Sequence, residues 1–258
     1  MRRTGFILLT LLLVSLLTLS PTVAYAKPGK PPSEEATPTQ NLIESPDGGA
    51  AAWDHTTLTI LINPNVYSPY SPEVSAGRRA IDHWKASIAW FSTQDWDGNS
   101  EADYPWLNQI NFIIYVQGVN ETLLTGPADV TITYYYKITP GYVLGSTSLS
   151  FEQVDGGYAI QSVDIVLGVK GLSIIGIENL VAHEFGHALG LEHSNKKGDL
   201  MYPSFDVTEE KKSIIPPSTL NLYALTISHS WLSTDLFSEY KGSLAITLPA
   251  NIPYQKAP

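Results

Sequence analysis

Cysteine is absent from the 258-residue chain. The protein can therefore form no disulfide, hold no metal through a thiolate and carry no lipid on a cysteine. A latency mechanism that uses a cysteine is excluded for the same reason. Without disulfides, the fold must be stabilised by its hydrophobic core or by a bound metal.

Basic side chains are few. The chain has 15 Lys and Arg against 25 Asp and Glu, which gives a formal net charge of −10 at pH 7. A surface of this charge repels phosphate backbones and anionic lipid. We therefore expect neither nucleic acid nor a membrane surface as a partner. The sequence does not indicate the oligomeric state, and a monomer is assumed.

Long hydrophobic runs are limited to residues 6–19, which follow Arg2 and Arg3 and precede the small-residue pattern of residues 24–26. This arrangement predicts a secretory signal peptide over residues 1–26, cleaved after Ala26, and hence a secreted, extracellular protein. The run has about 14 residues, fewer than the ~20 that span a bilayer. An uncleaved N-terminal anchor is therefore the less favoured alternative.

Residues 27–50 are rich in Pro, Ser, Thr and Gly and show little periodicity. This composition predicts a Pro/Ser-rich linker or a short pro-segment and not part of a core. Residues 51–258 are then expected to form one folded domain, with a C-terminal extension from about residue 233. No internal repeat is visible.

Hydrophobic periodicity predicts an α/β domain built on one mixed sheet. Ser71 is the expected N-cap of the first helix, and Pro72 is its first residue. The expected helices cover residues 72–91, 177–189 and 218 to 231 or 232. The expected strands cover residues 58–62, 110–116, 130–138, 142–151 and 160–169.

The segment HEFGHALGLEHS, residues 183–194, contains three of the six histidines of the chain. On a helix, His183 and His187 lie on one face, about 6 Å apart along the axis, so both imidazoles face one point. Glu184 points about 100° away around the helix and can flank a metal ion without binding it. The spacing therefore predicts two metal ligands with a carboxylate beside them.

Gly190 follows His187 by three positions and can take the positive φ that ends a helix and turns the chain back. His193 then arrives as a third ligand. Three histidines leave one tetrahedral position open, which is the arrangement of a catalytic zinc site. The five fixed residues of H-E-x-x-H-x-x-G-x-x-H would occur by chance in this composition about once in 10⁵. The scattered histidines, His55, His83 and His229, are not expected to bind metal.

The motif resembles the extended zinc-binding signature of the metzincin metallopeptidases. Ser194, directly after the third histidine, resembles the matrixin branch, which includes the matrix metalloproteinases. Residues 200–203, Leu-Met-Tyr-Pro, lie at the spacing of the matrixin Met-turn. The resemblance is strong over residues 180–205 and looser elsewhere. It implies a metzincin-like zincin domain with a mixed, mostly parallel five-stranded sheet, an antiparallel edge strand, an active-site helix, a Met-turn and a C-terminal helix.

The resemblance also implies a secreted zinc-dependent endopeptidase that hydrolyses peptide bonds with metal-activated water. One Zn²⁺ would be bound by His183, His187 and His193, with Glu184 as general base and Met201 as an apolar floor beneath the metal. An extended peptide substrate would pair with the strand at residues 142–151, where Gly145 would permit close backbone approach. The residues expected to contact substrate are Leu144, Gly145, Tyr202, Pro203 and Phe205.

Several features of the family are missing. The cysteine-switch pro-segment is absent, and no histidine-rich loop for a second zinc occurs, since no histidine lies between His83 and His183. No hemopexin-like repeat is visible. Carboxylates and carbonyls are suitable for structural Ca²⁺, although no calcium-loop pattern occurs. The chain is therefore similar to a minimal, microbial-style matrixin.

A gluzincin would take its third ligand from a glutamate some twenty residues downstream, near Glu209 and Glu210. Gly190 and His193 would then have no role, which disfavours this alternative. An astacin-like site is also disfavoured, because its extra tyrosine lies two residues after the methionine of the Met-turn, whereas here the tyrosine follows directly.

An alternative of another class is a non-catalytic secreted module that uses zinc to stabilise its fold or to bind a partner. Glu184 distinguishes the two functions, because a purely structural zinc site would not need it.

Overall fold

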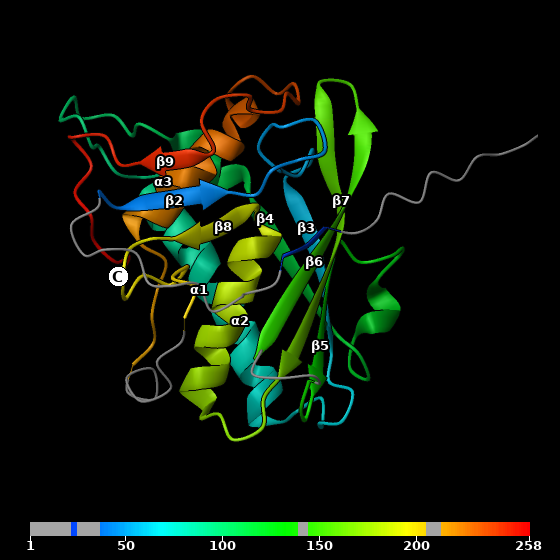
Figure 1. Cartoon of the computed structure of the whole chain (residues 1–258). Helices are drawn as coiled ribbons and strands as arrows, with labels where there is room; N and C mark the ends of the chain where they lie inside the picture. The colour runs from blue at the N-terminus through cyan, green and yellow to red at the C-terminus, as the bar shows by residue number, and fades with distance from the viewer. Residues whose placement is uncertain (1–21, 25–36, 139–143, 205–212) are drawn as a thin grey trace, which may run out of the picture.

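The main sheet of the computed structural model has the strand order β6-β7-β5-β3-β4. The structure describes residues 22–24, 37–138, 144–204 and 213–258 (Figure 1). The strands are β3 (Thr57–Asn63), β4 (Asn111–Val116), β5 (Val130–Tyr135), β6 (Gly145–Val154) and β7 (Gly157–Gly168). β3, β4, β5 and β7 run parallel, and β6 pairs antiparallel with β7. The predicted mixed sheet with an antiparallel edge strand is therefore confirmed.

A sixth, short strand lies on the outer side of β6. β1 (Thr22–Ala24) pairs antiparallel with β6, with Thr22 opposite Leu149 and Ala24 opposite Thr147. These residues fall within the predicted signal peptide, and the rest of residues 1–26 lies outside the described residues.

Alternation of buried and half-buried residues explains why these segments form strands. In β3, Leu58, Ile60 and Ile62 are buried, and the residues between them are less so. Successive side chains of a strand point to opposite faces, so one face of the sheet carries the apolar set. That face packs against the helices.

Three α-helices match the three predicted ones in position. α1 (Pro72–Phe91) has its predicted bounds, and the Ser71 side chain accepts a hydrogen bond from Val74 N at 3.3 Å. α2 (Ile174–Ala188) begins earlier than expected, because Ser173 caps it by accepting from Gly176 N at 3.0 Å.

α3 (Thr219–Ser228) starts with a capping box in which Ser218 and Asn221 satisfy each other's backbone N–H groups. It ends before the predicted residue 231, because His229 leaves the helical region and a short 3₁₀ turn, η3 (Ser230–Ser233), follows. Two further 3₁₀ turns are η1 (Pro105–Gln109) and η2 (Glu121–Leu123).

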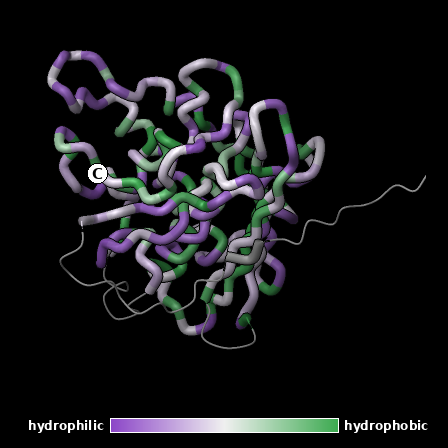
Figure 2. The backbone as a smooth tube through the Cα atoms, turned by 45° about the horizontal axis from the view of Figure 1, so that its top comes forward, coloured by the Kyte–Doolittle hydropathy of each residue, from purple (hydrophilic) through white to green (hydrophobic). Residues whose placement is uncertain are grey.

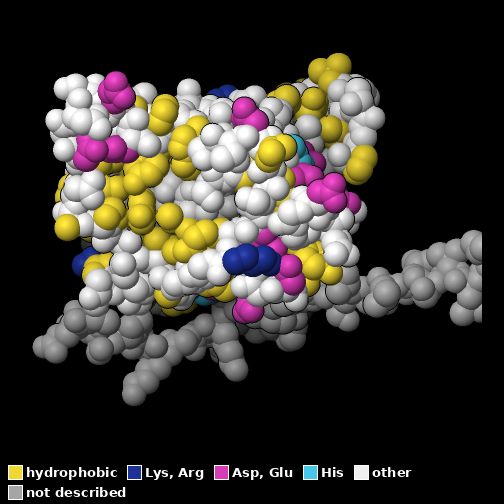
Figure 3. Space-filling view, turned by 90° about the horizontal axis from the view of Figure 1, so that it is seen from above, with side chains coloured by type: hydrophobic (Ala, Val, Ile, Leu, Met, Phe, Trp, Pro, Cys, Tyr) yellow, Lys and Arg dark blue, Asp and Glu magenta, His cyan; other side chains and the backbone are white. Residues whose placement is uncertain are grey.

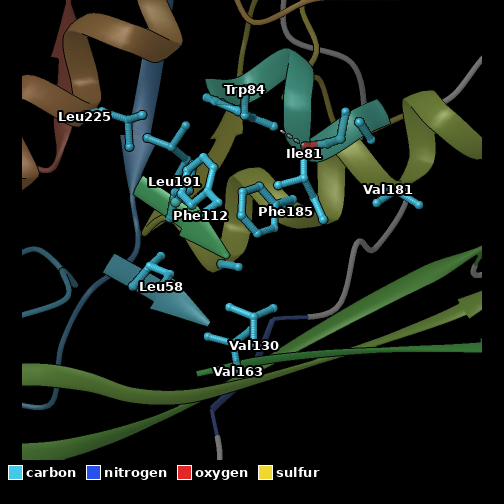
Figure 4. Close-up of a cluster of buried hydrophobic side chains, with 14 of the residues drawn as sticks. Leu58, Ile81, Trp84, Phe112, Val130, Val163, Val181, Phe185, Leu191 and Leu225 are labelled. Carbon is cyan, nitrogen blue, oxygen red and sulfur yellow. Dashed lines mark hydrogen bonds between the residues drawn. The ribbon is translucent and has the colours of Figure 1, made fainter. Parts of the chain in front are cut away.

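The core lies between the sheet and the helices α1 and α2 (Figure 1). In Figure 4, Phe185 of α2 faces Phe112 of β4, and Trp84 of α1 lies against α2, where its Nε1 donates to Ala182 O at 2.8 Å. The rings of Phe112 and Phe185 meet edge to face, with centroids 5.1 Å apart. Each of these large side chains contributes roughly 1.5–3 kcal/mol by its burial. This packing fixes α2 against the sheet.

A second, three-stranded antiparallel sheet was not predicted. Its strand order is β8-β2-β9, with β8 (Leu191–Ser194), β2 (Thr39–Leu42) and β9 (Ala245–Thr247). Figure 1 shows it beside α3, at the end of α2. The expectation of one sheet is therefore incomplete, because these strands of three or four residues are too short to show a period.

The linker prediction for residues 27–50 is wrong for its second part. Residues 39–42 form β2, and Leu42 and Ile43 are buried in the core. The backbone of Ile43 donates to Gly190 O at 2.9 Å, so this segment lies against the end of α2. Distant pairing partners stabilise it, although its polar composition resembles a linker.

The predicted C-terminal extension packs on the domain. Ile246 of β9 lies opposite Gln40, and Thr219 N donates to Gln255 O at 2.8 Å. The Tyr254 hydroxyl donates to Asp199 Oδ2 at 3.1 Å. The extension therefore joins the second sheet, α3 and the loop before Met201.

The surface carries both hydrophobic and polar side chains. The loop between α1 and η1 extends from the body of the molecule and is hydrophilic in Figure 2. On the face seen in Figure 3, acidic side chains are more widespread than basic ones, in agreement with the net charge of −10. None of the helices within the described ranges has the length and apolar character that crossing a membrane requires.

Candidate metal centre

α2 brings the first two histidines of the motif together. His183 and His187 lie one turn apart on this helix, and both are 2% exposed. Their ring centroids are 4.9 Å apart. Their proximity follows from the helical repeat, as the sequence predicted.

Gly190 turns the chain toward the third histidine. Its φ is +90°, in the left-handed region that favours glycine, and a Cβ there would overlap Ala51 O. The following residues form β8, which carries His193. The ring centroid of His193 lies 5.4 Å from that of His183 and 4.9 Å from that of His187. One ring nitrogen of each of the three histidines lies within 4.8 Å of the other two.

Each histidine is oriented through its Nδ1 atom. Nδ1 of His183 lies 2.7 Å from Leu200 O, and Nδ1 of His187 lies 2.7 Å from Leu191 O. Nδ1 of His193 lies 2.9 Å from the Glu192 carboxylate. These acceptors favour a proton on Nδ1, so a metal ion would be bound through Nε2.

The buried Nε2 atom of His193 has no hydrogen-bond partner among the residues that the structure describes. Buried polar atoms are normally satisfied, so an orphaned ring nitrogen beside two other imidazoles is the state expected of a metal ligand. The donor set is three imidazoles with no thiolate. This set suits zinc and leaves a coordination position for substrate or water.

Burial keeps the first two histidines neutral. It lowers the pKa of His183 well below the ordinary value, and the neighbouring histidines lower it further. Burial also lowers the pKa of His187 to about 4. Since metal binds only the neutral imidazole, both residues are ready for it at neutral pH.

Glu184 is 2% exposed and lies beside His183 on α2. Burial raises the pKa of its carboxyl group to about 7, although a hydrogen bond from Thr147 lowers it in part. The Thr147 hydroxyl donates to Glu184 Oε2 at 2.6 Å. A carboxyl group with a pKa near neutrality can both accept and return a proton.

Met201 lies beneath the helix that carries the first two histidines. It is fully buried, and a Cβ on Gly186 of α2 would overlap its sulfur. Its backbone N–H donates to Asp199 Oδ1 at 2.9 Å, and its carbonyl accepts from Ser194 N at 2.8 Å. The predicted apolar floor is thus connected directly to β8.

The residues predicted to contact substrate have different surroundings. Leu144 and Pro203 are half-buried, Tyr202 is buried, and Phe205 lies outside the described residues. At Gly145, the structure gives a different reason for glycine from the predicted approach of substrate. A Cβ there would overlap the Glu184 carboxylate, so the absent side chain makes room for that group.

The other histidines lie away from this cluster. His55 pairs with Asp54 at 2.8 Å, His83 with Glu178 at 3.0 Å, and His229 is buried with Nδ1 2.9 Å from Ser228 Oγ. Within the described ranges, no other group of histidines could hold a metal ion. Glu209 and Glu210, the ligands that a gluzincin would use, lie outside those ranges.

The only acidic cluster in the described parts of the chain joins Asp95, Asp97 and Asp103, whose carboxylate oxygens lie within 4.8 Å of one another. Oxygen ligands of this type suit calcium. However, the Asp95 carboxylate already accepts hydrogen bonds from the backbone of Gly98, at 2.6 Å, and Asn99, at 3.0 Å. Calcium therefore stays a sequence-based prediction.

Sequence reasoning missed three residues that surround the site: Thr147, Glu192 and Asp199. Glu192 is adjacent to His193, so its position in the motif could have indicated a role. Nothing in the local pattern singles out Thr147, which acts on Glu184, or the contact of Asp199 with Asn221, because these partners lie far away in the sequence. Only the folded chain brings them together.

Comparisons with known proteins agree with this geometry. The family model described as Matrixin matches residues 52–220, a range that includes the three histidines, Glu184 and Met201. A stretch of 42 residues is 48% identical to matrix metalloproteinase-18 of Xenopus laevis. This stretch is 16% of the present chain and 9% of that relative, so the chain matches only a small part of the relative's length.

Proposed function

This chain belongs to the matrixin family of zinc metallopeptidases, and from that membership we propose that it is a secreted zinc-dependent endopeptidase. The single observation that carries the proposal is the convergence of three histidine nitrogens within 4.8 Å of one another, beside a buried carboxylate. The three histidines provide a metal site with an open position. The buried carboxylate provides a proton acceptor next to that site.

The metal would be held by His183, His187 and His193. Their orienting partners and the unpartnered Nε2 of His193 support this assignment. Zinc bound there would supply Lewis acidity, which polarises a peptide carbonyl and makes a water molecule more acidic.

Glu184 acts as general base in this proposal. Its carboxylate takes a proton from the attacking water and returns it to the leaving amine of the cleaved peptide. Its burial and its pKa of about 7 support this role, because proton transfer in both directions is then nearly balanced near neutral pH.

The substrate would be an extended peptide lying antiparallel along β6. The position of β1 supports this, since Thr22–Ala24 pair antiparallel with this edge. An edge strand offers unpaired backbone groups that an added strand can use. Removal of residues 1–26 would leave the edge open for substrate. Tyr202, Pro203 and Phe205 would then wall the pocket for the side chain after the cleaved bond.

Secretion is the part of the proposal that depends on sequence alone. Its support is the run at residues 6–19 with Arg2 and Arg3 before it and the small residues 24–26 after it. An uncleaved N-terminal anchor is the alternative. N-terminal sequencing of the protein recovered from the culture medium distinguishes the two, with Lys27 expected as the first residue.

The enzymatic function is tested with the purified chain. We expect one zinc per chain by elemental analysis, cleavage of an unfolded protein such as reduced casein, loss of cleavage with a chelator and recovery on adding zinc. Stoichiometric zinc without any cleavage would support the alternative, a secreted module that zinc stabilises. Cleavage that survives complete removal of zinc would contradict both functions.

A further inference from the structure

Thr147 lies on the face of β6 that packs against α2. Gly145, Thr147 and Leu149 alternate as buried residues along this strand, and Thr147 is fully buried. Its hydroxyl donates to Glu184 Oε2 at 2.6 Å and lies 3.2 Å from Glu184 O. A threonine hydroxyl has a single proton, and the shorter distance places it on the carboxylate.

We propose that Thr147 is a positioning residue, which holds the Glu184 carboxylate in the orientation that its catalytic role needs. The inference rests on the proposed peptidase function. It adds a residue on β6, outside the histidine motif, to the groups that prepare the site for reaction.

The geometry leaves the carboxylate few other supports. Within the part of the chain that the structure describes, no other group donates a hydrogen bond to it. A buried carboxylate without a donor is strongly disfavoured, so the loss of this hydroxyl would let the side chain rotate in search of another partner.

The second carboxylate oxygen is placed by the neighbouring glycine. Glu184 Oε1 occupies the space that a Cβ on Gly145 would take. Two residues on the same face of β6 therefore define the position of the carboxylate, Thr147 through a hydrogen bond and Gly145 through absence of a side chain. The orientation of the carboxylate matters for catalysis, because small displacements of a reacting group lower the rate steeply.

The same residue faces the proposed substrate through its backbone. Thr147 lies opposite Ala24 in the pairing of β6 with β1, while its side chain points out of the plane of the sheet, toward α2. A peptide paired with β6 would thus lie beside the residue whose hydroxyl holds Glu184.

The test compares Thr147→Val, which removes the hydroxyl but keeps the shape, with Thr147→Ser, which keeps the hydroxyl. For the valine variant we expect kcat to fall about tenfold or more, KM to change less than about twofold and zinc content to stay at one per chain. The serine variant should keep kcat within about threefold of the parent. Thr131→Val, the same change on β5 in a half-buried position two strands away, is the matched control and should behave as the parent.

A second readout does not depend on turnover. A short peptide hydroxamate binds zinc and gives a proton to a carboxylate beside it, so calorimetry reports the orientation of Glu184 directly. We expect about fivefold weaker binding or more for Thr147→Val and near-parental binding for Thr147→Ser.

Parental kcat and hydroxamate affinity in Thr147→Val would overturn the inference, as would a serine variant that is as impaired as the valine variant. If the valine variant does not fold, Thr147→Ala against Thr147→Ser gives the same comparison. A parent that binds zinc and hydroxamate but cleaves no peptide would refute the peptidase function, while the calorimetric comparison would still decide the role of Thr147.

Discussion

The Glu192 carboxylate lies 2.9 Å from Nδ1 of His193, its neighbour in the sequence. The other two histidines of the site are oriented by backbone carbonyls, those of Leu200 and Leu191. The contact that orients the His193 ring therefore comes from a side chain, which mutation can remove. The orientation of His193 can therefore be tested by mutating Glu192.

We predict that Glu192→Ala weakens zinc binding about 10- to 100-fold, because the ring of His193 loses the acceptor that fixes its tautomer and orientation. Competition with a chelating dye measures the zinc affinity. Glu101→Ala, which removes an exposed carboxylate in the loop after α1, is the control and should bind zinc as the parent does. An unchanged affinity in Glu192→Ala would show that β8 alone orients the ring.

Glu184→Ala should separate zinc binding from hydrolysis. The three histidines are untouched, so zinc content should stay at one per chain, whereas kcat should fall about 10²- to 10⁴-fold through loss of the general base. Elemental analysis and a fluorogenic peptide assay measure the two quantities. Near-parental turnover would refute the general-base role.

Gly145→Ala should impair catalysis with little effect on zinc. The added Cβ would overlap the Glu184 carboxylate, so this group must move, and we expect kcat to fall about tenfold or more. Gly126→Ala is a matched control, since no atom of the described residues lies within 4 Å of the Cβ that it would add. Equal activity of the two variants would mean that the Glu184 carboxylate can move aside without lowering kcat.

Zinc should be lost in acid at a lower pH than ordinary histidines would allow. Burial lowers the pKa of His187 to about 4 and that of His183 well below its usual value, so protons compete with the metal for these two ligands only in more acidic solution. We expect full zinc content after dialysis at pH 5.5 and loss as the pH falls toward 4. Loss already complete at pH 6 would contradict this.

His229 should make the fold sensitive to acid. Burial lowers its pKa to about 4 in the folded protein, against about 6.5 in an unfolded chain. Between these values the unfolded chain binds more protons, so the free energy of unfolding is highest above pH 6.5 and falls as the pH drops toward 4. By pH 5 the loss from this residue is about 2 kcal/mol.

Urea unfolding at pH 7 and pH 5, in the presence of a chelator, measures this effect. His229→Gln should lose less stability over this interval than the parent, whereas His55→Gln, at an exposed histidine, should lose as much as the parent. Comparing the variants cancels the contribution of His183 and His187, which all three proteins share.

Elements with a strong local pattern could be predicted from the sequence alone. α1 has its predicted bounds because apolar residues recur at helical spacing over its whole length and Ser71 and Pro72 begin it. The cluster of His183, His187 and His193 was predictable for the same reason. Its spacing is set by one helix and one glycine turn.

Pairings between distant segments could not be predicted. β2 and β8 are four residues each, and their partners are far apart in the sequence, so neither strand shows a pattern of its own. The contact between Thr147 and Glu184 has the same character. It depends on the register of β6 against α2, and no periodicity within either element specifies that register.

The second sheet has a consequence for the order in which the chain is made. β8 carries His193 and pairs with β2, whose other edge is covered by β9, near the C-terminal end of the sequence. The sheet that supports His193 can therefore close only after β9, which follows α2 and α3 in the sequence, has been synthesised. Folding of the metal centre thus depends on pairing between segments from both sides of the histidine motif.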